Sequence, residues 1–393
     1  MEKLLNIGAP YIGLNGGDKE RARFQLDALR AAYAVHNLLV ARPAELSATM
    51  PAHEAAGPAL GIPGAPGRGL RPASIYEPEA SALPALLAKL KAERYPVAFF
   101  RYLGPTRLVA HVRRALPAAR IVIDADMILS RIAQQAWRQD RRPGNRFFLF
   151  ETFRVRRYEQ WIFNEPHLFL MSNPDELAYV REHFVRAGAR SRFALVPNVM
   201  PDVPARALPP AQEGPGGYLL FYGMLGSAVN RDAFRFLVAE IYARLHDALE
   251  AQDLRIRVVG RGLCDFHRDL VARHGCGRIE LAGEAEDIGA EVAGALVCLA
   301  PLRMGSGTKT RVLEAAAYGT CVVTTPLGAE GLDFDADELI VEVTAEGIAG
   351  AVRGLLADPD ARRARGERLR AKCVARYSRD AVGRQLLEAI AGA

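Results

Sequence analysis

Short apolar runs alternate with amphipathic stretches along most of the chain. In the first half, apolar runs of strand length lie at residues 3–7, 36–40, 97–102, 120–124, 168–171 and 192–196. Segments with apolar residues at helical spacing lie between them; one begins near Lys19 and another covers about 175–187. This alternation predicts a parallel sheet covered by helices on both faces. Residues 51–73, with five prolines and five glycines, are predicted to form a loop without a core of its own.

The same pattern begins again after a segment rich in proline and glycine at 201–217. The runs that predict a second set of strands lie at 218–222, 255–259, 278–281, 296–300 and 321–325. Glycine closely follows three of them, at Gly223, Gly260 and Gly283, and so marks the carboxyl edge where such sheets bind ligands. We therefore predict an α/β protein with two Rossmann-like, doubly wound domains and a cleft between them. The predicted ranges are 1–205, 206–370, and 371–393 for a C-terminal helix that packs back on the first domain.

Composition excludes several classes of protein. Half of the 393 residues are hydrophobic and 24% are charged, as in ordinary globular proteins. The chain has no apolar run of the ~20 residues that cross a bilayer, and its N-terminus lacks the apolar stretch of a signal peptide. We therefore expect a cytoplasmic protein. The five cysteines form no C-x-x-C pair, so we expect no metal site of the zinc type.

The net charge of +6 is concentrated in residues 131–161. This segment holds eight arginines against Asp140, Glu151 and Glu159, and seven aromatic residues are interleaved with them. Such a segment can lie on an anionic membrane surface, here the inner face of the membrane, or hold an anionic acceptor. The alternative is a solvated helix face with its aromatic side chains turned to the core. No recognised nucleic-acid module accompanies the charge, so nucleic acid is not an expected partner.

The most informative stretch, at 300–319, runs from the end of a buried strand through a turn of small residues into a helix. Backbone N–H groups of the turn and the N-terminus of the helix can bind a diphosphate, and neighbouring basic side chains add full charges. The residues concerned are Arg303, Gly305, Ser306, Gly307, Thr308, Lys309 and Arg311. Glu314, one turn inside the helix, can accept hydrogen bonds from the hydroxyls of a ribose; the alternative is an i,i+3 ion pair with Arg311.

Three other motifs are incomplete or short. Residues 305–310 lack the glycine before the lysine that a Walker A loop needs, because Thr308 stands there. The pattern that begins at Gly260 has Asp265 in place of the last glycine of a dinucleotide-binding fingerprint. The pair Asp124 and Asp126 matches the short D-x-D of metal-dependent glycosyltransferases, but three residues match by chance often.

At this point the sequence resembles the retaining family 4 glycosyltransferases of the GT-B fold. The resemblance rests on ordered blocks, which are F-Y-G-M at 221–224, N-R-D-A at 230–233, V-V-G at 258–260, L-A-G at 281–283, A-P-L-R-M-G-S-G-T at 300–308, V-L-E-A at 312–315 and G-A-E-G-L at 328–332. In the first half, Gly16-Gly17 before a helix resembles the family's glycine loop near the donor phosphate. The resemblance implies a nucleotide-diphosphate sugar donor, retention of anomeric configuration, no catalytic metal and no cofactor.

The resemblance also implies roles for individual residues. Glu314 corresponds to the second glutamate of the family's E-x7-E pattern, which binds the donor ribose; the first glutamate is replaced by Ser306. Arg231 is the nearest match to the family's basic pair. Base and ribose are expected against the edge residues Gly260, Gly283, Glu286 and Glu314, with Arg303 and Lys309 stabilising the leaving diphosphate.

The acceptor is expected to be a glycan, a lipid-linked or a small-molecule hydroxyl compound. Asp126 is predicted either to orient the acceptor hydroxyl or to cap the helix that follows it. Two alternatives to a transferase remain: a nucleotide-sugar epimerase of GT-B architecture and a non-catalytic donor-binding subunit, the latter suggested by Ser306.

Overall fold

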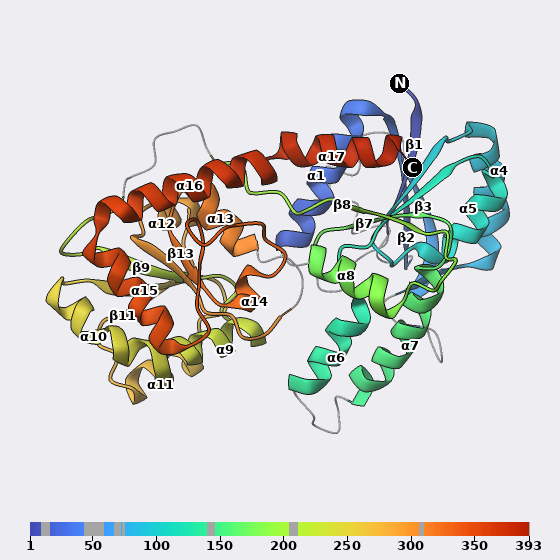
Figure 1. Ribbon diagram of the computed structural model, residues 1–393. Helices are drawn as coiled ribbons and strands as arrows, with labels where there is room; N and C mark the ends of the chain where they lie inside the picture. The colour runs from blue at the N-terminus through green and yellow to red at the C-terminus, as the bar shows by residue number, and fades with distance from the viewer. Residues whose placement is uncertain are drawn as a thin grey trace. The chain divides into compact units, whose positions relative to one another are not determined.

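The computed structural model describes residues 1–8, 16–42, 59–66, 72, 75–139, 146–203, 211–305 and 310–392. These residues form two compact units (Figure 1). Unit 1 contains Met1–Asn198 and Val382–Ala393, and unit 2 contains Val199–Ala381. Each unit has a parallel sheet with helices on it, as the alternating pattern predicts.

Within the described residues, unit 1 contains an eight-stranded sheet in the order β4-β3-β2-β1-β5-β6-β7-β8. The strands are β1 (Lys3–Gly8), β2 (Ala34–Ala41), β3 (Ala59–Pro66), β4 (Tyr76–Pro78), β5 (Val97–Arg101), β6 (Arg120–Asp124), β7 (Leu168–Met171) and β8 (Arg192–Leu195). All neighbours pair in parallel except β3 and β4. The carboxyl ends of the parallel strands therefore lie along one edge of the sheet.

Helices pack on this sheet through their apolar faces. They are α1 (Gly16–Ala32), α4 (Leu83–Glu93), α5 (Val109–Ala115), α6 (Leu129–Gln139), α7 (Arg146–Ile162) and α8 (Pro174–His183), with short 3-10 turns η1 (Ala80–Ala82) and η2 (Thr106–Leu108). One buried cluster joins α4, α5, α7 and α8 to the strands. Helices α6 and α7 pack against each other as a hairpin (Figure 1).

Strand β3 is a correction to the loop predicted at 51–73. It pairs with β2 along Asn37–Ala41 even though its sequence contains Pro63 and Pro66. Gly64 permits this close packing, because a Cβ there would lie 2.6 Å from the Val40 side chain and 2.9 Å from the Glu77 carbonyl. Residues 59–66 form a strand because they pair with the backbone of β2, whereas their own sequence does not predict one.

Unit 2 contains, in its described part, a six-stranded parallel sheet in the order β11-β10-β9-β12-β13-β14. The strands are β9 (Tyr218–Tyr222), β10 (Arg255–Val259), β11 (Ile279–Gly283), β12 (Val297–Ala300), β13 (Val322–Thr324) and β14 (Ile340–Val341). The helices are α9 (Ala228–Phe236), the π-helical turn η4 (Leu237–Ile241), α10 (Tyr242–Ala251), α11 (Asp265–Arg273), α12 (Ile288–Ala293), α13 (Thr310–Tyr318), α14 (Pro326–Ala329), α15 (Ala345–Ala357) and α16 (Pro359–Tyr377).

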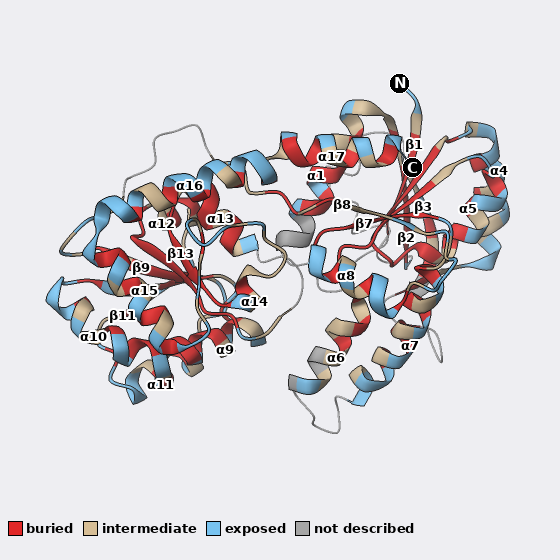
Figure 2. Cartoon of the chain, viewed as in Figure 1, coloured by how far each residue is buried: buried red, intermediate tan, exposed pale blue. Residues whose placement is uncertain are grey.

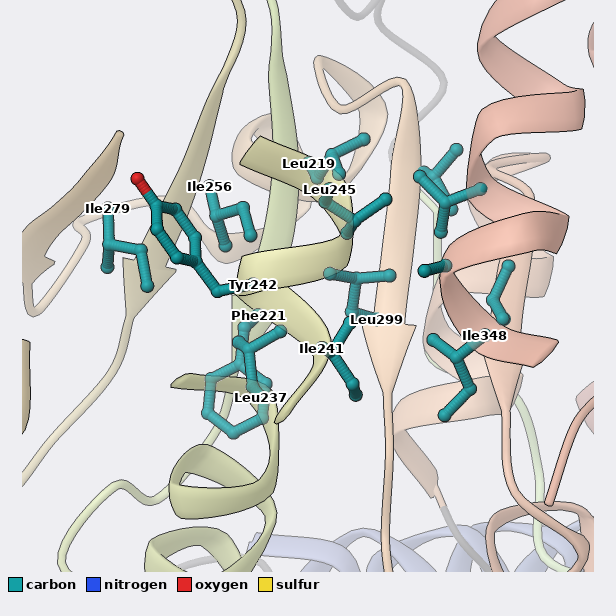
Figure 3. Packing of buried hydrophobic residues seen from close by; sticks show 14 of the residues in the cluster. Leu219, Phe221, Leu237, Ile241, Tyr242, Leu245, Ile256, Ile279, Leu299 and Ile348 are labelled. Carbon is teal, nitrogen blue, oxygen red and sulfur yellow. The ribbon is translucent and has the colours of Figure 1, made fainter. Parts of the chain in front are cut away.

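Helices cover both faces of this second sheet, and each face has its own buried cluster. On one face, Leu237, Ile241 and Leu245 pack on Phe221 and Ile256 of the strands, as Figure 3 shows. On the other face, the buried residues come from α12, α13 and α16. The strands β9, β12 and β13 are thus buried on both sides, which explains why they are nearly uninterrupted apolar runs in the sequence (Figure 2). Strands β10 and β11 are less buried and carry charged residues.

The division between the units lies at Asn198/Val199, whereas the sequence predicted a boundary at 205/206. Helix α16 packs on α13 within unit 2, so the chain returns to unit 1 at Val382 and not at residue 371. Helix α17 (Arg379–Ala391) then lies beside α1, and Arg120 at the start of β6 donates a hydrogen bond to the Ile390 carbonyl at 3.0 Å.

Candidate functional site

The carboxyl edge of the unit 2 sheet is formed by interlocked glycines. The Gly223 N–H donates to the Val259 carbonyl at 3.0 Å, and the Gly260 N–H donates to the Gly283 carbonyl at 2.6 Å. Gly260 has φ 141°, and a Cβ there would overlap the Gly223 carbonyl oxygen. The ends of the two strands therefore approach each other more closely than any side chain allows. This packing explains why residues 223 and 260 are glycine, independently of any contact with a ligand.

Arg311, in the first turn of α13, lies against this edge. Its Nη2 donates to Asn230 Oδ1 at 2.5 Å, and its guanidinium carbon lies 5.6 Å from the Phe221 ring centroid. A Cβ at Gly223 would overlap Nη2, so only glycine leaves room for the guanidinium. Burial lowers the pKa of Arg311, although the nearby hydroxyl of Tyr222 and the carboxyl of Glu314 oppose the shift.

The second nitrogen of this guanidinium, Nη1, is buried and has no hydrogen-bond partner among the described residues. An unpaired buried N–H of a cationic group is costly, because its lost hydration is not replaced. The sequence left open an i,i+3 ion pair between Arg311 and Glu314. In the structure Arg311 donates to Asn230 instead. The position of Arg311 and its nitrogen without a partner among the described residues are suited to binding an anion.

Glu314 lies one turn further along α13 and is partly exposed. Burial raises its pKa, and a hydrogen bond from the Tyr222 hydroxyl and the charge of Arg311 oppose the shift. Burial likewise raises the pKa of Tyr222, whose hydroxyl donates to the Arg311 carbonyl at 2.8 Å. Tyr222, at the end of β9, thus fixes the helix and its carboxylate on the sheet edge.

The other predicted donor residues differ in how they are held. Arg303 forms a two-point ion pair with Asp232, at 2.9 and 3.1 Å, and stacks on the Phe236 ring at 4.4 Å. The side chain of Arg231 is exposed over the Phe266 ring, and that of Glu286 is exposed between β11 and α12. Gly305 has φ 114°. Ser306, Gly307, Thr308 and Lys309 lie outside the described residues.

In unit 1, the carboxyl edge is organised by a residue that sequence reasoning missed, Arg21 of α1. This arginine is buried and bridges the two acids of the D-x-D motif: its Nη2 lies 2.6 Å from Asp124 Oδ1, and its Nε lies 3.3 Å from Asp126 Oδ1. Its Nη1 donates to the Val196 carbonyl at 3.0 Å and to Asn198 Oδ1 at 2.9 Å. Burial acts to lower the pKa of Arg21, but the two carboxylates outweigh it and raise the pKa.

Asp126 is buried, and its pKa is raised by burial in spite of the Arg21 charge. Its backbone carbonyl accepts a hydrogen bond from the Ser172 hydroxyl at 2.9 Å, which ties the end of β6 to that of β7. The capping alternative is wrong, because α6 begins at Leu129 and not directly after Asp126. Gly16 and Gly17 form the start of α1, earlier than the start predicted near Lys19.

Among the described residues, Asp335, Asp337 and Glu338 lie close enough together to hold a cation. They are already paired: Lys372 contacts Asp335 at 2.6 Å and Glu338 at 3.0 Å, and Arg368 contacts Asp337 at 3.5 Å. All three carboxylates are therefore already in ion pairs with positive side chains.

Comparison with known proteins shows what this fold and this edge are similar to. Residues 216–358 match the model of a family described as glycosyl transferases group 1. A glycosyltransferase from Rickettsia africae ESF-5 has a TM-score of 0.69 at 12% identity, over 100% of this chain and 98% of that chain. Anabaena Alr3699/HepE, solved in complex with UDP-glucose, has a TM-score of 0.62 at 13% identity, over 99% and 100%.

WaaG, a glycosyltransferase involved in lipopolysaccharide biosynthesis, has a TM-score of 0.59 at 16% identity, over 98% of each chain. No curated protein matches this chain. Two units with parallel sheets, similar in structure to these enzymes, define the GT-B fold. Residues 216–358 therefore resemble the glycosyl transferases group 1 family, and the whole chain has the fold of these glycosyltransferases.

Proposed function

We propose that this protein transfers a sugar from a nucleotide-diphosphate donor to a hydroxyl acceptor, with retention of configuration and without a catalytic metal. The supporting observation is that Arg311 and Glu314 lie near each other at the unit 2 sheet edge without forming an ion pair. A buried guanidinium nitrogen with no partner among the described residues lies one helical turn from a partly exposed carboxyl group. One suits a phosphate and the other a pair of ribose hydroxyls.

The chemistry follows from where charge develops. As the glycosidic bond breaks, the diphosphate gains negative charge, and Arg311 together with the N-terminus of α13 stabilises it. Lys309 and the 305–308 turn are proposed to add to this positive environment. A departing phosphate oxygen takes the acceptor proton, so a strong protein base is not needed. Protein cations carry the electrostatic role that a metal has in other glycosyltransferases, which is the basis for proposing metal independence.

The neighbours suggest which donor to test first. Alr3699/HepE was solved with UDP-glucose, so uridine diphosphate and its sugars are the first candidates. WaaG acts in lipopolysaccharide biosynthesis, so we propose a role in glycan, polysaccharide or glycoconjugate synthesis, with a glycan, lipid-linked or small-molecule acceptor.

The test compares wild type with Glu314→Gln and, as a matched control, Glu250→Gln, an exposed glutamate of α10. UDP-sugar binding is followed by thermal shift and titration calorimetry. We expect Glu314→Gln to weaken binding about tenfold to a hundredfold, since a charged hydrogen-bond acceptor is lost, while Glu250→Gln leaves it unchanged. Because burial raises the pKa of Glu314, wild-type affinity should fall on acidification at a higher pH than for an exposed glutamate. Glu314→Gln should lack that step.

Product analysis separates the alternatives. Anomeric NMR of the product formed with and without EDTA tests retention and metal independence. Epimerised donor in the absence of acceptor would replace the proposal with an epimerase. Tight donor binding with neither transfer nor donor hydrolysis would indicate a binding subunit.

A further inference from the structure

Exposed apolar side chains gather on one helix of unit 1. Of the eleven large hydrophobic residues that are exposed in the described part of the chain, five lie on α7. They are Phe147, Leu149, Phe150, Phe153 and Trp161. Phe153 is 62% exposed and Trp161 is 43% exposed, so these rings are not turned to the core. Scattered exposed hydrophobics need no explanation, but a cluster on one helix marks an interaction surface.

These residues share a helix face with arginines. Phe150, Phe153, Arg157 and Trp161 follow one another at spacings of three and four, the repeat of one helix face, and Arg146 precedes them on the same face. The opposite face carries Val155, Tyr158 and Ile162, which are buried in the core of unit 1. Helix α7 is therefore amphipathic, with a second apolar surface on the side away from the core.

The exposed face of α7 carries positive charge only. The helix has two acidic residues, and both are buried: Glu151 pairs with Arg154 at 3.0 Å, and Glu159 accepts a hydrogen bond from the Ser130 N–H at 3.3 Å. The arginines at 146 and 157 are exposed. Eight arginines against three acids within 131–161 supply nearly all of the net charge of +6.

We propose that the exposed face of α7 docks on a membrane surface rich in anionic lipid. Aromatic rings enter the boundary between headgroups and acyl chains, and the flanking guanidinium groups bind lipid phosphates. A surface of this composition matches an anionic bilayer better than a protein partner, because the charge is of one sign and lies beside the apolar rings. The inference is independent of the proposed reaction, since it concerns a different surface and needs no turnover.

Tryptophan fluorescence can report whether this face of α7 binds a membrane. It has two tryptophans, Trp137 on α6 and Trp161 on the proposed face. In a full-length Trp137→Phe variant, the fluorescence of Trp161 alone is recorded while vesicles are added. Vesicles of equal parts phosphatidylcholine and phosphatidylglycerol should shift the emission to the blue, whereas pure phosphatidylcholine should give little or no shift. Raising the salt from 0.1 M to 1 M shortens the screening length from ~10 Å to ~3 Å and should weaken binding.

Vesicle flotation tests the residues. Phe150→Ser combined with Phe153→Ser should lower the bound fraction roughly tenfold or more, and Arg146→Glu combined with Arg157→Glu should do the same at low salt. Val343→Ser removes an equally exposed apolar residue of unit 2 and is the matched control, which should bind as wild type does. Circular dichroism and urea unfolding followed by tryptophan fluorescence check that unit 1 of each variant is folded. Both pairs alter exposed positions, so the same loss in two chemically different pairs argues against a folding defect.

Three results would overturn the proposal. The first is wild type that floats with neither kind of vesicle, and the second is binding of both pairs of α7 variants equal to that of wild type. The third is a wild-type dimer in sedimentation that the serine pair converts to a monomer, which would mean that a second copy of the chain covers this face.

Discussion

At the scale of single residues, Arg21 connects several segments at the carboxyl edge of the unit 1 sheet. One guanidinium contacts two buried carboxyl groups, those of Asp124 and Asp126, and holds the segment at Val196–Asn198 through three further acceptors. All these groups lie at the carboxyl edge of the sheet, where the acceptor is proposed to bind. A single lone arginine in a helix has no local signature, and its partners lie more than 100 residues away in the sequence. The sequence could therefore indicate Asp126 but not what holds it.

Replacing this arginine should lower the stability of unit 1, because the carboxyl groups of Asp124 and Asp126 are buried. We expect Arg21→Met to destabilise unit 1 by about 3–5 kcal/mol at pH 8, since two carboxylates lose their counter-charge. The loss should become smaller as the pH falls, because the pKa of Asp126 is raised by burial, the removal of the Arg21 charge raises it further, and protonation removes the carboxylate charge. Urea unfolding followed by tryptophan fluorescence measures this unit alone, because Trp137 and Trp161 both lie in it.

The double variant Arg21→Met/Asp124→Asn should recover part of that stability, because one of the uncompensated charges is gone. Arg114→Met, at an exposed position of α5, should change stability by no more than about 0.5 kcal/mol. Equal losses at positions 21 and 114 would show that the carboxylates do not depend on Arg21.

At the scale of elements, the α6–α7 hairpin combines the exposed face described above with a buried acid, Glu159. Burial raises the pKa of this carboxyl from the ordinary value of 4.5 to about 7, although hydrogen bonds from Ser130 oppose the shift. Between these values the folded chain holds a proton that the unfolded chain has lost. Stability should therefore fall as the pH rises from about 4.5 toward 7, by at most ~3 kcal/mol.

A Glu159→Gln variant should remove that fall. It should be more stable than wild type at pH 8 and differ little at pH 5, as measured by urea unfolding with tryptophan fluorescence. Glu182→Gln, an exposed glutamate of the same unit, serves as the control and should leave the pH profile of wild type unchanged. A wild-type profile that is flat between pH 5 and pH 8 would contradict the proposed burial of Glu159.

The elements also show where sequence patterns succeed. The run at 218–222 coincides with β9, because a strand buried on both faces is continuously apolar. The run at 255–259 coincides with β10, although Arg255 and Arg257 interrupt its apolar residues. Strand β3 was missed because only Ile62 in it is β-branched, and its pairing depends on β2 rather than on its own residues. In the candidate site, Gly223, Gly260 and Glu314 could be predicted from strand ends and spacing, whereas the contact of Arg311 with Gly223 depends on packing across the sheet edge.

At the scale of the whole molecule, two units with separate cores should unfold in distinguishable transitions. The residues proposed to bind base, ribose and diphosphate lie mostly on unit 2. UDP should therefore stabilise unit 2 more than unit 1. At a hundred times its dissociation constant, a ligand that binds only the folded state adds about 2.7 kcal/mol.

Calorimetry of the full chain follows both transitions, while tryptophan fluorescence follows unit 1, so the two signals can be compared at each UDP concentration. A rise confined to the calorimetric transition of unit 2 is the expected result. An equal rise in the fluorescence transition would require that unit 1 binds the nucleotide as strongly, through the start of α1 at Gly16 and Gly17. Each unfolding transition rises with UDP only as far as UDP binds the folded form of that unit better than its unfolded form. Comparing the rises of the two transitions therefore shows how the binding free energy is divided between the two sheets.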